Sequence, residues 1–265
     1  MLIFRVVLAA MVSLSTSVEI YNTTSGPVFS SDPDSNGVRV FRSLPFAAPP
    51  TEDLRWKPPQ PVASWEDPLD VSPFPAMCKQ GAAYPSVPPD HSSDSEDCLY
   101  LFLYTTSPPV ESSPVVSSVT GDTALKPVLL FVHGGGLSDG DAWLGGYYDG
   151  SALALSQDVV VVSVQYRLGA FGFLAHEAFS YGDNGLSRGN FGALDQRAAM
   201  QWVQVGLLLL LSRFVTGIGQ SSRRPSRNQL RSGTHVRQIG TLFSQPLVFI
   251  FRATPPLSAA ILPEF

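Results

Sequence analysis

Two apolar runs rich in valine set the strongest limit on how this chain can fold. They read VLLFV at Val128–Val132 and VVVVSV at Val159–Val164. Because neither run alternates apolar with polar residues, each is typical of a strand buried on both faces, as in a parallel sheet. Residues Ser151–Leu155, between the two runs, can form the crossover helix that a parallel pair needs. The order of strand, helix and strand predicts an α/β fold.

Other segments fit the same architecture. Val38–Phe41 and Leu99–Tyr104 are predicted to be strands. Asn190–Gln204 is predicted to be a helix, because apolar residues recur at every fourth position from Leu194 to Trp202. The stretch between the first two strands is rich in proline, which lacks a backbone donor, so we expect surface loops there.

Charge divides the chain into two parts. The 265 residues have a net charge of −5, which argues against a protein that binds nucleic acid through a basic surface. Residues 1–204 carry a net charge of −11, whereas residues 205–265 carry +6 with a single acidic residue, Glu264. Within this tail, Leu207–Leu211 can continue the preceding helix, and Leu247–Phe251 can form a strand or an aggregation-prone segment.

The first 17 residues have the features of a secretory signal peptide. Arg5 supplies a positive charge, Val6–Val12 is apolar, and small residues follow up to Ser17. The alternative is an ordinary buried first strand. Asn22 opens the glycosylation sequon Asn-Thr-Thr, which implies a lumenal route. No apolar run of 18 residues occurs, so we expect no transmembrane segment and a secreted protein.

Cys78 and Cys98 are the two cysteines of the chain. They can form one disulfide, which an oxidising compartment favours, or remain as two buried thiols. Neither a Cys-x-x-Cys pair nor a His-rich spacing is present in the sequence. We therefore expect no structural metal and no cofactor.

A glycine-rich tetrapeptide, His133-Gly134-Gly135-Gly136, directly follows the first buried run. Three glycines let the backbone turn tightly and leave N–H groups that can bind a developing oxyanion, where one donor contributes about 3–4 kcal/mol. The alternative is a plain glycine-rich turn.

Six segments, taken in order, give the chain a specific family resemblance. They are RSLPFAAPP (42–50), LRWKPPQP (54–61), SEDCLYLFLY (95–104), VLLFVHGGG (128–136), VVVVSVQYRLGAFGFL (159–174) and GNFGALDQRAAMQWVQ (189–204). From about Val18 to Gln204 the chain resembles the type-B carboxylesterases and cholinesterases, which are α/β-hydrolases.

The resemblance implies roles for particular residues. Gly135 and Gly136 would donate the two hydrogen bonds of the oxyanion hole, and Cys78 and Cys98 would form the family's N-terminal disulfide. The substrate would be a small carboxylic ester. The implied fold is a truncated α/β-hydrolase, with the N-terminal part of a mixed sheet and its flanking helices.

We accordingly divide the chain into three parts. Residues 1–17 are the expected signal peptide, residues 18–204 the partial α/β-hydrolase domain, and residues 205–265 a tail outside the family, expected to be poorly ordered.

The nucleophile motif of the family is missing from its expected place. Its Gly-x-Ser-x-Gly elbow would follow the helix that holds Trp202, but no such pattern occurs after Gln204. Ser221, in Gly219–Arg223, lacks the second glycine and is a weak candidate. His235 is the only later histidine, and the family's acid and base lie further downstream than this sequence reaches. A serine without its base is a poor nucleophile, so we expect an inactive fragment of an ester hydrolase.

Two further expectations follow from the resemblance. The alternative function is a secreted, non-catalytic binding or adhesion module of the cholinesterase-like kind. In the family, the nucleophile strand lies beside the strand that precedes the glycines. Without it, Val128–Val132 would be an exposed edge that favours self-association.

Overall fold

The computed structural model describes residues 18–31, 33–80, 94–106, 126–177, 189–212, 237–239 and 247–251. The expected signal peptide lies outside these residues. The strands are β1 (Ile20–Asn22), β2 (Pro27–Phe29), β3 (Arg39–Pro45), β4 (Leu69–Asp70), β5 (Met77–Cys78), β6 (Asp94–Ser95), β7 (Tyr100–Thr105), β8 (Val128–Val132), β9 (Val160–Val164), β10 (Arg237–Ile239) and β11 (Leu247–Phe251). The helices are α1 (Ser151–Gln157), α2 (Gly169–Phe173) and α3 (Phe191–Ser212), with short 3-10 turns at Glu52–Leu54 and Leu144–Gly146.

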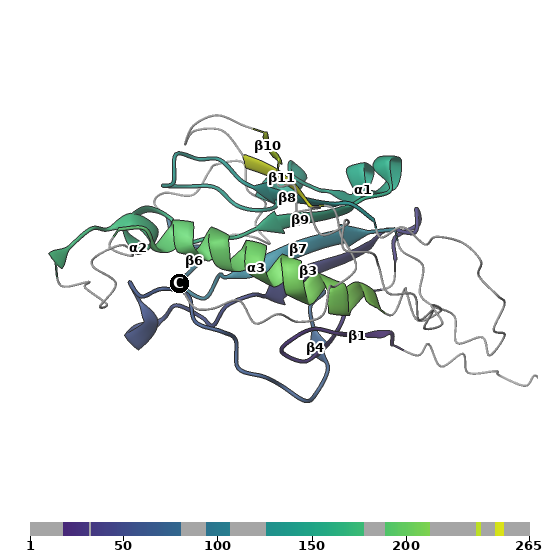
Figure 1. The fold of residues 1–265 in the computed structure, drawn as a ribbon, viewed down its shortest axis with the longest axis horizontal. Helices are drawn as coiled ribbons and strands as arrows, with labels where there is room; N and C mark the ends of the chain where they lie inside the picture. The colour runs from purple at the N-terminus through teal and green to yellow at the C-terminus, as the bar shows by residue number, and fades with distance from the viewer. Residues whose placement is uncertain are drawn as a thin grey trace, which may run out of the picture.

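A six-stranded sheet in the order β10-β11-β8-β9-β7-β3 forms the centre of the molecule (Figure 1). β8 and β9 pair in parallel, and α1 connects them. The predicted strand, helix and strand unit is therefore confirmed. The other pairs in this sheet are antiparallel, so the sheet is mixed, as the resemblance implies.

Both faces of the sheet are covered by helices. Alternate residues of a strand point to opposite faces. Leu101 and Leu103 of β7 pack in one cluster with Trp202 of α3, whereas Phe102 and Tyr104 pack in another with Ala154 of α1. This two-sided burial explains why the strand sequences are apolar throughout.

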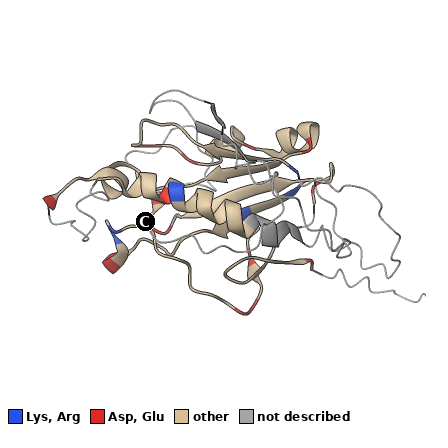
Figure 2. Cartoon of the chain, in the orientation of Figure 1, with Lys and Arg blue, Asp and Glu red and all other residues tan. Residues whose placement is uncertain are grey.

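α3 is longer than predicted. It begins at Phe191, where the N–H of Leu194 donates to the carbonyl of Asn190, and it continues to Ser212. The expectation that Leu207–Leu211 extends the helix is confirmed. The charged positions of α3 lie together in the half nearer α2 (Figure 2). Among the described residues, no helix is long and apolar enough to cross a bilayer.

Two small sheets pack beside the central one. β1, β2 and β4 form the first, and β5 and β6 form the second. Cys78 of β5 is bonded to Cys98, two residues before β7, with an S–S distance of 2.04 Å. The disulfide implied by the resemblance is present in the structure.

The expectation that β8 is an exposed edge is wrong. β11 pairs with β8 in antiparallel register along its whole length, from Leu247 opposite Val132 to Phe251 opposite Val128. The tail therefore supplies two strands to the sheet, because an apolar segment can satisfy the backbone groups of β8 whatever its direction. The rest of residues 213–265 lies outside the described part of the chain.

We predict that removing the tail causes self-association. A chain that ends after Ser212 loses β11, so the N–H and C=O groups along β8 are left unpaired at an apolar edge. Size-exclusion chromatography with light scattering should show larger species for the shortened chain than for the full chain at equal concentration. Identical monomeric peaks would contradict the prediction.

Candidate functional site

The segment His133–Gly140, called here the glycine loop, follows the carboxyl end of β8. Two hydrogen bonds to the carbonyl of Gly135 stabilise its turn: the N–H of Ser138 donates at 3.1 Å and the N–H of Asp139 at 3.2 Å. Gly135 has φ of 119°, and a Cβ atom there would overlap the backbone carbonyl of Asp139. Only glycine fits this position.

The N–H groups of Gly135 and Gly136 have no hydrogen-bond acceptor among the residues that the structure describes. Gly135 is half-buried and Gly136 is exposed. Two adjacent backbone donors that are free and accessible can bind an anionic oxygen, as an oxyanion hole requires.

Groups from the β9 side hold the glycine loop in place. The hydroxyl of Tyr166 donates to the carbonyl of His133 at 3.0 Å, and the N–H of Gly169 donates to the carbonyl of Leu137 at 2.8 Å. Burial raises the pKa of Tyr166, so its hydroxyl keeps the proton that it donates. The start and the middle of the loop are therefore both fixed.

His133 is a buried member of the loop. Its side chain is 2% exposed and stacks on Tyr166 with ring centroids 4.5 Å apart. Nδ1 lies 2.9 Å from the carbonyl of Gly134, which can only accept, so Nδ1 carries the proton. Burial lowers the pKa of His133, and Nε2 has no hydrogen-bond partner among the described residues. The ring is thus neutral, and no serine hydroxyl in that part of the chain bonds to it.

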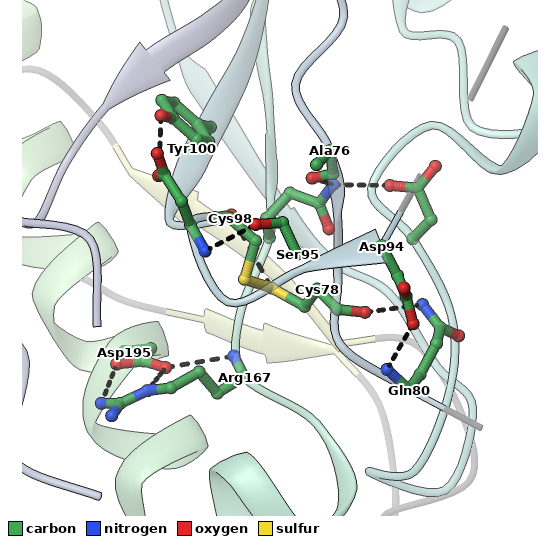
Figure 3. Close-up of a disulfide and its surroundings, with 12 residues drawn as sticks. Ala76, Cys78, Gln80, Asp94, Ser95, Cys98, Tyr100, Arg167 and Asp195 are labelled. Carbon is green, nitrogen blue, oxygen red and sulfur yellow. Dashed lines mark hydrogen bonds and ion pairs between the residues drawn. A yellow bond between two sulfur atoms is a disulfide. The ribbon is translucent and has the colours of Figure 1, made fainter. Parts of the chain in front are cut away.

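A buried ion pair connects the segment after β9 to α3. Arg167 donates through Nε at 2.8 Å and Nη2 at 2.7 Å to the two oxygens of Asp195, and its backbone N–H donates to the same carboxylate at 3.1 Å (Figure 3). Nη1 donates to the carbonyl of Lys57 at 2.9 Å. Burial raises the pKa of Asp195, and the three donors oppose that shift by favouring the carboxylate.

Two residues singled out in the sequence, Ser221 and His235, lie outside the residues that the structure describes. Asn22 is exposed at the end of β1. Among the described residues there is no group of three His, Cys, Asp or Glu side chains that could hold a metal.

Sequence reasoning missed three polar residues around the loop: Gln80, Asp141 and Gln165. Their contacts join segments far apart in the chain, and no motif marks them. The only signal was position: Gln80 follows a cysteine closely, and Gln165 directly follows β9.

A small hollow lies apart from the glycine loop, with a volume of about 10 Å³, enough for one water molecule. It is lined by Pro50, Arg55, Lys79, Glu96, Cys98, Arg167 and Phe171. This hollow is too small for an ester.

The sequence over residues 17–207 matches the model of the carboxylesterase family. The chain belongs to the carboxylesterase family. The matched region includes both the glycine loop and the Arg167–Asp195 pair.

Relatives in this family are similar over the same region. The chain is 41% identical to rabbit cocaine esterase over 201 residues, and 39% identical to rat liver carboxylesterase B-1 over 215 residues. These alignments cover 70% and 73% of this chain but 33% and 35% of the relatives. The carboxylesterase-family chain thus spans about one third of the length of the curated relatives that it matches.

Solved esterases share the fold. A thermophilic pNB esterase superposes with a TM-score of 0.59 at 31% identity, over 73% of this chain and 36% of that one. The predicted partial α/β-hydrolase fold is confirmed.

We predict that Asp195→Ala lowers the free energy of unfolding by about 3–5 kcal/mol, because Arg167 is left as an unpaired buried charge. Urea unfolding followed by circular dichroism measures the change. Lys126→Ala is the matched control. It breaks the pair with Asp158, whose side chain is 74% exposed, and should cost less than about 1 kcal/mol. Equal losses in both variants would contradict the prediction.

We predict that acid destabilises the chain through His133. Its folded pKa lies below the ordinary value of 6.5, so below that pH the unfolded chain binds a proton that the folded chain does not. The free energy of unfolding should fall as pH decreases through this range, by at most about 1.4 kcal/mol per pH unit.

Urea unfolding at about pH 7.5 and about pH 5.5 tests this titration. His133→Asn cannot titrate, so its stability should fall less between the two pH values than that of the unaltered chain. An equal fall would show that other groups cause it.

Proposed function

We propose that the glycine loop is the oxyanion cradle of a carboxylic ester hydrolase. The observation that carries the proposal is the pair of free N–H groups on Gly135 and Gly136, in a loop fixed at the carboxyl end of β8. In ester hydrolysis, negative charge develops on the carbonyl oxygen when the nucleophile attacks. Two fixed backbone donors stabilise that charge without reorganising.

We propose further that this chain by itself does not turn esters over. No Gly-x-Ser-x-Gly pattern follows α3; the two matches in the sequence, Gly136–Gly140 and Gly185–Gly189, precede that helix. A nucleophile elbow follows the carboxyl end of its strand, but β11 runs antiparallel to β8. Its carboxyl end at Phe251 therefore lies beside Val128, away from the glycine loop. Charge stabilisation without a nucleophile gives no acyl transfer.

The proposed route of the chain is secretory. The disulfide between Cys78 and Cys98 suits an oxidising compartment, and the sequon residue Asn22 is exposed at the end of β1, where a glycan can be attached. Residues 1–17 are proposed to be the signal that directs this route.

A nitrophenyl ester assay together with a serine-directed fluorophosphonate label tests the function. We predict no hydrolysis above the uncatalysed rate and no label on any serine, because no Gly-x-Ser-x-Gly elbow follows α3. An active serine esterase in the same buffer is the positive control for both reagents, because it hydrolyses the ester and takes up the label. Label on Ser221 with ester turnover would contradict the proposal, and the same assay on Ser221→Ala would confirm the site of attachment.

A further inference from the structure

We infer that Gln80 is a positioning residue for the glycine loop. Its carboxamide binds both backbone groups of Gly140 and so holds the turn that presents Gly135 and Gly136. The inference rests on the proposed function of the loop, and no motif in the sequence marks Gln80.

The contact between Gln80 and Gly140 has two hydrogen bonds. The N–H of Gly140 donates to Oε1 of Gln80 at 2.9 Å, and Nε2 of Gln80 donates to the carbonyl of Gly140 at 3.0 Å. The backbone N–H can only donate, which fixes the end of the carboxamide that faces it. One side chain therefore acts on Gly140 as a neighbouring strand would, although the two residues are 60 positions apart.

Gly140 in turn supports the start of the glycine loop. A Cβ atom on Gly140 would lie 2.5 Å from Nδ1 of His133 and 2.6 Å from the carbonyl oxygen of Gly134, and φ is 120°. Gly140 thus closes the loop directly against its first two residues. If Gly140 moves, the loop opens at its base.

Gln80 is itself held in place. Nε2 also donates to the carbonyl of Cys78 at 3.1 Å, and the backbone N–H donates to Oδ2 of Asp94 at 3.4 Å (Figure 3). Cys78 is cross-linked to Cys98 and both are fully buried. The disulfide segment therefore gives the carboxamide a fixed origin.

A second carboxamide holds the residue after Gly140. Nε2 of Gln165 donates to Oδ1 of the buried Asp141 at 2.7 Å, while Oδ2 of Asp141 accepts from the N–H of Leu144 at 2.9 Å. This contact fixes the chain beyond the loop from the β9 side. Gln165 therefore bonds to Asp141, whereas Gln80 bonds to Gly140 itself.

Nuclear magnetic resonance on the ¹⁵N-labelled full chain tests the inference. In Gln80→Met, which keeps the side-chain length but cannot hydrogen-bond, the amides of Ser138 and Asp139 should exchange about tenfold faster. Those amides bond to Gly135 rather than to Gln80, so faster exchange reports the turn itself. The amide signals of Gly135 and Gly136 should also shift, while exchange in β9 stays unchanged.

Gln80→Glu supplies a reversible version of the same test. An ionised carboxylate would face the carbonyls of Gly140 and Cys78 without a proton to donate, whereas the protonated acid can donate. The exchange of Ser138 and Asp139, relative to the unaltered chain at the same pH, should rise about tenfold near pH 7.5 and return toward equality near pH 4.5. The titratable groups around this position are Lys79, Asp94, His133, Asp139 and Asp141.

Gln60→Glu is the matched control, because Gln60 is exposed and its Nε2, among the described residues, donates only to the carbonyl of Pro58, at 2.9 Å. It should leave the loop amides unchanged at both pH values. Unchanged exchange at Ser138 and Asp139 in Gln80→Met, or a Gln80→Glu variant that shows no return at low pH, would overturn the inference.

Methylphosphonate, added to the unaltered chain, separates this inference from the proposed function. Saturable shifts of the Gly135 and Gly136 amides that weaken in Gln80→Met support both. A loop that loosens in Gln80→Met but shows no response to methylphosphonate supports the positioning role and counts against the oxyanion cradle.

Discussion

Backbone hydrogen bonding on both sides of β8 is the constraint on which the rest of the structure depends. β9 pairs with it in parallel from Val128 opposite Val160 to Val132 opposite Val164, and β11 pairs with its other side in antiparallel register. Because β8 ends at Val132, this double pairing decides where the glycine loop emerges. Apolar side chains on both faces keep the strand dry, which strengthens these backbone bonds.

A loop of glycines needs external partners, because glycine has no side chain to hold a turn and loses much backbone freedom when it is ordered. Here those partners come from two directions. Tyr166 and Gly169 act from the segment after β9, and Gln80 acts from the disulfide segment. Arg167 lies between Tyr166 and Gly169, and its pair with Asp195 fixes that segment to α3. The supports of the loop are thus themselves anchored in buried structure.

In this chain the sheet can be complete although the strand that completes it does not end near the glycine loop. The sheet and the loop at the end of β8 are present in this member of the carboxylesterase family, and β11 occupies the side of β8 where the resemblance implied a nucleophile strand. An antiparallel strand can satisfy the backbone groups of its neighbour as a parallel one does, through a different hydrogen-bond pattern, but its carboxyl end lies at the opposite end of that neighbour. Pairing can therefore complete a sheet without restoring a catalytic geometry, which depends on where each strand ends.

The sequence by itself determined the local elements and the family. The runs at Val128–Val132 and Val159–Val164 predicted two buried parallel strands, and the apolar period from Leu194 to Trp202 predicted the helix. Both predictions were possible because the spacing of apolar residues indicates whether one face or both faces of an element are buried. Only the tertiary structure decided that Leu247–Phe251 pairs with β8 and that the carboxamide of Gln80 hydrogen-bonds to the backbone of Gly140. Both contacts join distant segments through backbone groups, which every residue carries, so no local pattern distinguishes the segments that will meet.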